Sequence, residues 1–278
     1  MVSYKLVLVD TPAPYVRRVT LNRPEKRNAL NATLQREVID ALREGDRDPE
    51  VRVQIVRGAG TSFSAGYDLA PEPGEYATEG GGQGAFQRTV VDRWTGIWDL
   101  DKPVIAQVHG HCLAGGSELA TGCDLVYVAE DAKIGYPAVR FGVPDMQYQA
   151  WLLGMRKAME FMLTGDSMSG AEAVEHGFAN RAYPAAELEE HVLERAQRVA
   201  QIPADVLQAN KRTVHRAMER MGLRDALRAG TELSALAVHN DGFKAFMASA
   251  QEKGLTKALS ERDTSFGDGR TGDARPPR

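Results

Sequence analysis

The chain has 278 residues, of which 43% are hydrophobic and 26% charged, and its formal net charge is −4 at pH 7. This composition is typical of a globular protein with room for one full domain and an appendage, and the acidic balance argues against a dedicated nucleic-acid surface. No stretch is apolar for long enough to indicate a signal peptide or the roughly 18 residues of a membrane span. Two cysteines, Cys112 and Cys123, are too few for a disulfide framework, so we expect reduced thiols and a cytoplasmic protein.

The first quarter of the chain alternates strand and helix patterns. Apolar alternation at residues 4–9 and 15–21 predicts two strands joined by a turn at 10–14. A helix is expected to start at residues 28–31, and β-branched alternation at 51–57 predicts a further strand. This order favours an α/β fold with a largely parallel sheet, whose ligand crevice lies beyond the carboxyl ends of the strands.

Two glycine-containing stretches follow predicted strands. One is residues 61–69, TSFSAGYDL. The other contains Gly115 and Gly116, which lie between a predicted buried strand at 103–108 and a predicted first helical turn at 117–121. Glycine lets a substrate approach the backbone, and the unpaired amides of a helix start favour negative charge. Because an oxyanion hole takes two converging donors, the two stretches together predict a site for an enolate or phosphate oxygen.

The remaining segments have simpler patterns. Residues 71–84 are rich in glycine and poor in apolar residues, which predicts a mobile lid or rim loop. Residues 86–100 have helical spacing, and beyond residue 184 helical spacing continues almost without a break to residue 246. The end, residues 263–278, predicts a loosely held tail.

Three motifs in this order resemble the crotonase superfamily, also called the enoyl-CoA hydratase/isomerase family. They are NRPEKRNAL at 22–30, SFSAGYDL at 62–69 and LAGGSELATGCDL at 113–125. Looser similarity continues to residue 184. The resemblance implies an α/β fold with a crotonase-type repeated ββα spiral core and a C-terminal helical oligomerisation region.

The resemblance also implies a division of the chain and an assembly. The acyl-CoA-binding and catalytic core would span residues 1–200, the helical oligomerisation region 201–262, and the tail 263–278. Related proteins assemble through such helices, so we expect a homotrimer or a dimer of trimers. No nucleic-acid or membrane partner is expected.

The site residues are carried over from the family's motifs. The resemblance implies that the amides of Tyr67 and Gly115 hold the oxygen of an acyl-CoA thioester and that Glu118 moves protons. A thioester carbonyl held in this way has an acidic α-carbon and an electrophilic β-carbon, because the enolate is stabilised in place. The residues implied in binding CoA are Lys26, Arg27, Ala65, Gly66, Asp68 and Leu69. No cofactor beyond the CoA of the substrate, and no metal, is implied.

The chain departs from the family at one catalytic position. Similar hydratases use a second glutamate that would fall at Ala138 in this sequence. Since hydration divides proton transfers between two carboxylates, loss of this second glutamate should weaken a standard hydratase. One carboxylate is enough for a proton shuttle that moves a proton between two carbons. Asp145 is the second acid/base candidate, and Tyr136 could lend a phenol to the vacant position. Aroyl-CoA dehalogenases, a third branch, use an aspartate in the region of Asp145 but generally lack a glutamate at position 118.

Three functions follow from this departure. The first is hydration and dehydration of a 2-enoyl-CoA, the second is double-bond isomerisation with a single carboxylate, and the third is acyl-CoA binding without turnover.

Some residues also have a structural interpretation. Glu118 could only stabilise a helix start, Asp145 could only cap the following helix, and Lys26 and Arg27 could be ordinary surface charges. A group of His109, His111 and Cys112 lacks the further ligands of a zinc site.

Overall fold

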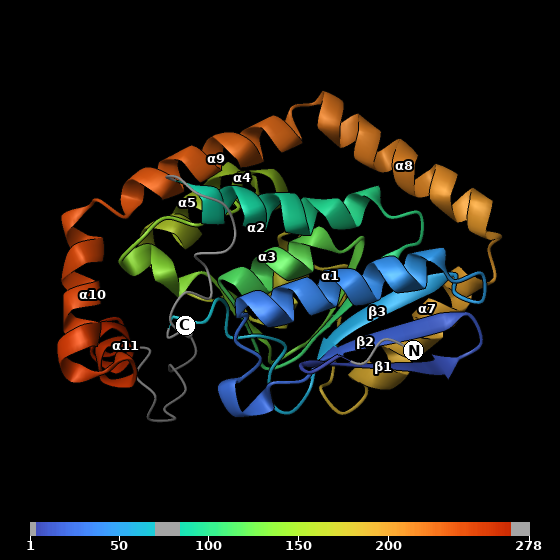
Figure 1. Ribbon diagram of the computed structural model, residues 1–278, viewed down its shortest axis with the longest axis horizontal. Coiled ribbons are helices and arrows are strands. Elements are labelled where there is room, and N and C mark those ends of the chain that lie inside the picture. Colours follow the sequence, from blue (N-terminus) through green and yellow to red (C-terminus); the bar gives the residue numbers. More distant parts are fainter. Residues whose placement is uncertain (1–3, 70–83, 268–278) are drawn as a thin grey trace.

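A six-stranded sheet forms the base of the molecule in a computed structural model that describes residues 4–69 and 84–267 (Figure 1). The strand order is β1-β2-β3-β4-β6-β8, and only the β1/β2 pair is antiparallel. The strands are β1 Val7–Ala13, β2 Val16–Leu21, β3 Val53–Gly58, β4 Val104–Val108, β6 Leu125–Ala129 and β8 Arg181–Tyr183. β4 is buried along its whole length, as expected for a central parallel strand covered on both faces.

A second, smaller sheet brings the two glycine-containing stretches together. It consists of β5 (His111–Leu113) and β7 (Lys133–Gly135), which pair in parallel. The loop after β3 joins its edge, because the Ser64 amide donates to the His111 carbonyl at 2.9 Å and the Leu113 amide donates to the Ser64 carbonyl at 3.0 Å. The carboxyl ends of β3 and β4 therefore lead into loops that are hydrogen-bonded to each other.

Helices cover both faces of the large sheet. α1 (Ala32–Arg47) packs on β1 and β2, and its N-terminus is capped by the Asn31 side chain, which accepts from the Leu34 amide. α7 (Leu188–Ala200) packs across the strands on the opposite side (Figure 1). The α2 helix (Ala85–Thr95) continues as η2 (Gly96–Asp99) and lies over α3 (Gly115–Gly122). The shorter helices are η1 Pro24–Lys26, η3 Pro137–Arg140, α4 Gln149–Leu152, α5 Gly154–Thr164 and α6 Gly170–Glu175.

Four C-terminal helices form an arch over this core (Figure 1). They are α8 Ala204–Arg220, α9 Leu223–Ala237, α10 Asp241–Lys253 and α11 Leu255–Thr264. α9 packs along α2. The C-terminal helices therefore fold back over the same chain and reach the part of the core where the two loops meet.

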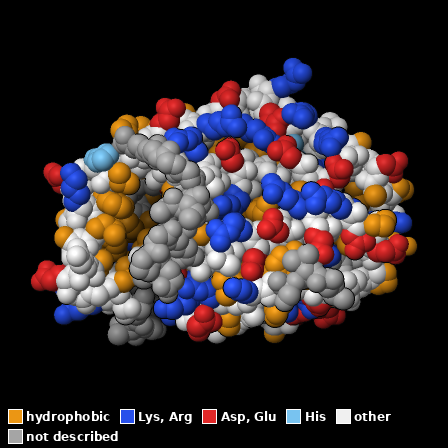
Figure 2. Space-filling view, in the orientation of Figure 1, with side chains coloured by type: hydrophobic (Ala, Val, Ile, Leu, Met, Phe, Trp, Pro, Cys, Tyr) orange, Lys and Arg blue, Asp and Glu red, His pale blue; other side chains and the backbone are white. Residues whose placement is uncertain are grey.

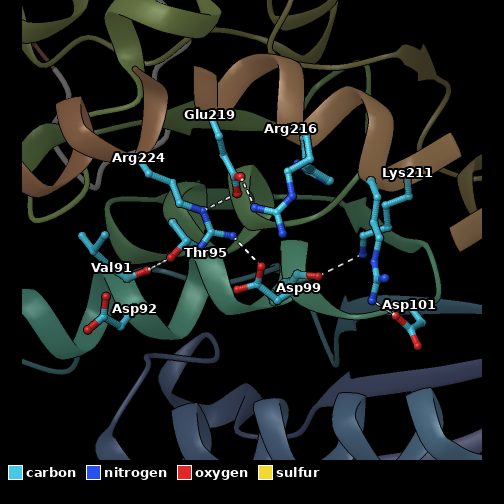
Figure 3. A network of polar contacts seen from close by, with 12 residues as sticks. Val91, Asp92, Thr95, Asp99, Asp101, Lys211, Arg216, Glu219 and Arg224 are labelled. Atoms are coloured by element: carbon cyan, nitrogen blue, oxygen red, sulfur yellow. Dashed lines mark hydrogen bonds and ion pairs between the residues drawn. The ribbon is translucent and has the colours of Figure 1, made fainter. Parts of the chain in front are cut away.

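Ion pairs fix the elbow between α8 and α9 to η2. Arg224 contacts Asp99 at 2.7 Å and Glu219 at 2.6 Å, and Glu219 also pairs with Arg216 at 2.7 Å (Figure 3). Closer to the start of α8, the buried Lys211 ammonium donates to the Ile97 carbonyl at 2.9 Å. These contacts set the direction in which α9 crosses α2.

Several predicted boundaries were wrong. β1 continues to Ala13, and the chain turns at Pro14 and Tyr15 rather than over residues 10–14, because Asp10 and Ala13 pair with β2 and Asp10 also binds the Arg18 side chain at 2.6 Å. The predicted continuous helix over residues 223–246 is interrupted after Ala237. The predicted lid at 71–84, except for Gly84, and most of the predicted tail lie outside the described residues.

The described residues include no helix long and apolar enough to cross a membrane. Within the same ranges, the structure contains no cluster of three or more His, Cys, Asp or Glu side chains suited to a metal ion. His109 and His111 instead bind the loop after β3. His109 Nε2 lies 2.9 Å from the Gly60 carbonyl, and His111 Nδ1 lies 3.1 Å from the Ser62 hydroxyl. Both cysteines are buried free thiols.

Candidate active site

The backbones of the two loops touch at Gly66 and Gly115. Gly66 has a φ of +98°, and a Cβ atom there would lie only 2.8 Å from the Leu113 carbonyl, so only glycine fits. Ala114 has a φ of +47° and turns the chain directly into α3. Among the described residues, neither the Tyr67 amide nor the Gly115 amide donates a hydrogen bond. The two amides predicted to hold a thioester oxygen are therefore free donors on adjoining loops.

Asn28, from the first sequence motif, holds the Tyr67 loop in place. Its buried side chain donates to the carbonyls of Ala59 and Ser62 at 2.9 and 2.8 Å, and it accepts from the Arg23 amide at 2.9 Å. The Ser64 hydroxyl donates to the Asn28 carbonyl at 2.8 Å. Asn28 thus explains why the motif at residues 22–30 accompanies the loop at 62–69, although the two lie on different elements.

Glu118 lies in the first turn of α3 and is completely buried. Its Oε1 accepts from the Tyr136 hydroxyl and the Met146 amide, both at 2.9 Å. Its Oε2 accepts from the Tyr67 hydroxyl. Three donors therefore converge on this carboxyl group, which is more than a residue that only stabilises a helix start would need.

Asp145 is the second buried carboxyl group of the site, with 9% exposure. Its Oδ1 accepts from the Ser234 hydroxyl of α9 at 2.9 Å, and its amide donates to the Tyr136 hydroxyl at 3.3 Å. It does not cap a helix, because α4 begins at Gln149, four residues later. The capping interpretation of Asp145 was therefore wrong.

The pKa values of both carboxyl groups are raised. Burial, followed by the charge of Asp145, raises the pKa of Glu118 to about 8, although its hydrogen bonds oppose the shift. Burial raises the pKa of Asp145 to about 6, and the Ser234 hydroxyl acts in the opposite direction. Buried carboxyl groups that influence one another and titrate near neutrality are typical of acid/base sites.

The Tyr67 ring lies between Gly115 and Glu118. A Cβ atom added to Gly115 would be 2.6 Å from the ring carbon that carries the Tyr67 hydroxyl, so the ring packs directly on this glycine. The Trp94 indole of α2 donates to the same hydroxyl at 2.9 Å. Tyr67 therefore contributes its side chain as well as its amide to the site.

Ala138 lies in η3 and carries no group that could replace the glutamate of similar proteins. The Tyr136 phenol does reach Glu118, and it connects Glu118 to the Asp145 amide. Sequence reasoning named Tyr136 but missed three other contributors, which are Trp94, Ser234 and the Met146 amide. Trp94 has the spacing of a core residue, and Ser234 lies 89 residues from its partner, so no local pattern marks either one.

The residues predicted to bind CoA lie at η1 and on the loop after β3. Lys26 and Arg27 are exposed, and the Arg27 carbonyl accepts from the Ala65 amide at 2.9 Å. Asp68 forms a 2.6 Å ion pair with Arg23, and Leu69 is 40% exposed. Lys26 also lines a cavity of about 560 Å³ together with α10 and α11 residues that include Lys253 and Lys257.

The sheet is covered by helices, and two adjoining loops each present a free amide in front of a buried carboxyl group. This combination defines an enzyme of the crotonase fold. The chain belongs to the enoyl-CoA hydratase/isomerase family, whose model, described as "Enoyl-CoA hydratase/isomerase", matches residues 14–269.

Curated proteins and solved structures show the same relationship. The chain is 35% identical over 253 residues to a probable enoyl-CoA hydratase of Rhizobium meliloti (strain 1021), covering 88% of this chain and 96% of that protein. It is 32% identical over 195 residues to the mitochondrial Delta(3,5)-Delta(2,4)-dienoyl-CoA isomerase of Homo sapiens, covering 66% and 60%. The crystal structure of an enoyl-CoA hydratase/isomerase from Xanthobacter autotrophicus Py2 is similar with a TM-score of 0.86 and 33% identity, covering 95% of this chain and 99% of that one.

Proposed function

We propose that the protein hydrates 2-enoyl-CoA thioesters and catalyses the reverse dehydration. The observation that carries this proposal is the pair of buried carboxyl groups, Glu118 and Asp145, beside the free amides of Tyr67 and Gly115. The amides hold the thioester oxygen as the enolate forms, which is the largest contribution expected from such a site. Two carboxyl groups are the number that hydration needs, one to deprotonate water and one to exchange a proton with the α-carbon.

Double-bond isomerisation is the second candidate function. Ala138 favours it, because the glutamate that similar hydratases use is absent and Asp145 occupies a different part of the chain. An isomerase would use Glu118 or Asp145 alone to move a proton between two carbons. The third candidate, acyl-CoA binding without turnover, would keep the amides and make no use of the raised pKa values.

Labelling with heavy-oxygen water separates these functions. We expect a short 2-enoyl-CoA incubated with the enzyme in H₂¹⁸O to gain one ¹⁸O at the β-carbon, detected by mass spectrometry. Glu118→Gln should lower this rate by about 10²–10⁴-fold, the range typical of a lost acid/base group. A migrated double bond without label would identify an isomerase. If neither product forms, the protein binds acyl-CoA without turnover.

The CoA nucleotide is proposed to lie against Lys26 and the cavity between η1 and α11. Lys253 and Lys257 line that cavity with Lys26, and all three are exposed. Ammonium groups suit the phosphates of CoA, and Lys253 also pairs with Glu261 at 2.9 Å. Ala65, Gly66, Asp68 and Leu69 are proposed to bind CoA as well. CoA enters as part of the substrate, and no other cofactor is proposed.

A homotrimer or dimer of trimers is proposed for the assembly. Met155, Met159 and Leu163 of α5 recur every four residues and are 67%, 49% and 74% exposed. Leu233 and Leu236 of α9 are each 58% exposed, and hydrophobic side chains also gather on the surface at the end of the molecule that carries α10 (Figure 2). A second copy of the chain would cover such apolar helix faces. The buried free thiols are consistent with a cytoplasmic location, which we also propose.

A further inference from the structure

The oxygen of Glu118 that Tyr136 and Met146 leave open is covered by Tyr67. Glu118 Oε1 is occupied by the Tyr136 hydroxyl and the Met146 amide, and Glu118 Oε2 is occupied by the Tyr67 hydroxyl. The Tyr67 ring also packs on Gly115. A thioester held at the Gly115 amide therefore lies next to the Tyr67 phenol, with Glu118 behind that phenol.

The Tyr67 oxygen is itself held by a fixed donor. The Trp94 indole N–H points at it from 2.9 Å, and Trp94 is completely buried in α2. The phenol therefore accepts one hydrogen bond and donates another, which leaves one lone pair on its oxygen. An oxygen with this arrangement can take up a proton on one side while it releases its own proton on the other.

We propose that Tyr67 is a catalytic residue that exchanges a proton with the α-carbon of the substrate, while Glu118 takes up the phenol's own proton and Trp94 positions the phenol. The inference rests on the proposed acyl-CoA chemistry and assigns the group that touches the substrate.

The proton-transfer step is balanced. The bond between the α-carbon and its hydrogen breaks, and that proton forms a new O–H bond with the Tyr67 oxygen. The phenol's original proton moves at the same time to Glu118 Oε2, which must start as a carboxylate. The electron pair of the broken bond stays on the thioester as an enolate, which the Tyr67 and Gly115 amides hold. The reverse transfer returns a proton to carbon.

The two protons move together, so a free phenolate never forms. This matters because burial and the charge of Glu118 raise the pKa of Tyr67 well above its ordinary value. The same relay serves hydration and isomerisation, since both pass through an enolate or its equivalent.

Deuterium exchange at the α-carbon tests the relay without depending on the acyl reaction. The wild-type enzyme and Tyr67→Phe would be incubated with butyryl-CoA in D₂O, and α-deuteration would be followed by NMR. Tyr67→Phe keeps the ring on Gly115 and the backbone amide but lacks the hydroxyl. We expect its exchange rate to fall by about 10²–10⁴-fold, while the Kd for butyryl-CoA, measured by calorimetry, stays within about threefold.

Trp94→Phe provides the second variant, because it keeps an aromatic ring and removes the N–H donor, together with part of the buried ring volume. We expect about a tenfold loss of kcat with little change in KM, because one hydrogen bond to a reacting oxygen is lost. A merely structural role would instead lower the amount of folded enzyme and leave kcat per folded molecule unchanged, and that result would contradict the positioning role of Trp94.

The outcomes separate the relay from the proposed function. If Tyr67→Phe exchanges the α-proton at the wild-type rate, the relay is overturned, because Glu118 would then reach the substrate directly. The proposed function would still stand. If the wild-type enzyme neither exchanges the α-proton nor turns over any enoyl-CoA, the proposed function fails and the relay fails with it.

Discussion

At the scale of a residue, the proposed chemistry depends on the charge state of one side chain, Glu118. Its pKa of about 8 means that the carboxyl group is largely protonated at neutral pH, because burial and Asp145 both disfavour the charged form. A step that needs the carboxylate should therefore accelerate as the pH rises toward 8. The three hydrogen bonds to Glu118 limit how far the pKa rises, so they keep the group usable near neutrality.

Folding stability should report the same shift. A free glutamate has a pKa of about 4.3, so between that pH and about 8 the folded chain binds a proton at Glu118 that the unfolded chain has released. The stability from this group is fully present below about pH 4.3 and is lost as the pH rises through 8, with a slope of at most about 1.4 kcal/mol per pH unit.

Glu118→Gln removes this titration, so we expect the variant to gain in free energy of unfolding relative to wild type as the pH rises from 5 to 8. Urea unfolding at pH 5, 6.5 and 8 measures the difference. Wild-type and Glu118→Gln stabilities that change in parallel with pH would contradict the raised pKa of Glu118.

At the scale of elements, the C-terminal helix α9 completes the site of its own chain. Ser234 of α9 is 4% exposed and donates to Asp145, while the Arg224 ion pairs at the start of α9 hold the helix against η2 (Figure 3). The helical region therefore contributes to the proposed catalytic site as well as to the proposed assembly. A core cut off at residue 200 would lack the partner of Asp145.

Ser234→Ala should change how the activity depends on pH. The Ser234 hydroxyl lowers the pKa of Asp145, so its removal should raise that pKa above its present value of about 6. We expect the acidic limb of kcat/KM to move to higher pH, and stability to fall by about 1 kcal/mol for the lost hydrogen bond. Ser234→Thr keeps the hydroxyl and is the control. An acidic limb that stays in place in Ser234→Ala would show that Asp145 does not titrate in the reaction.

At the scale of the whole molecule, the proposed substrate extends from the buried carboxyl groups to the surface. The acyl end would reach Glu118 in the core, while the nucleotide end would lie at a cavity formed by η1 and α11, which are far apart in the sequence. The fold therefore joins the N-terminal turn at Lys26 to the last helices at a single proposed binding surface.

Removal of the basic groups at this cavity should weaken binding only for substrates that carry the nucleotide. For the double variant Lys253→Ala, Lys257→Ala we expect KM for an enoyl-CoA to rise by about tenfold, with kcat unchanged, since exposed charge contacts contribute about 1 kcal/mol or less each. The matching N-acetylcysteamine thioester lacks the nucleotide and should keep its KM. Equal losses for both substrates would indicate a structural effect instead.

The sequence by itself determined the family, the parallel α/β core and the two loops. These follow from local patterns, because buried β-branched strands, a glycine at a positive φ and a helix start each leave a mark within about ten residues. The resemblance then located Tyr67, Gly115 and Glu118, and the structure places all three together. The turn before Val16 and the break after Ala237 were misplaced, since pairing between strands and packing between helices decide where such elements end.

Only the tertiary structure decided what surrounds Glu118. Trp94 and Ser234 come from helices 24 residues before and 116 residues after it in the chain, and each looks like an ordinary residue of an amphipathic helix. The side-chain role of Tyr67 was also hidden, because the motif identifies its amide and says nothing about where its hydroxyl lies. Hydrogen bonds between distant elements, and the burial that raises a carboxyl pKa, arise only when the whole chain has folded.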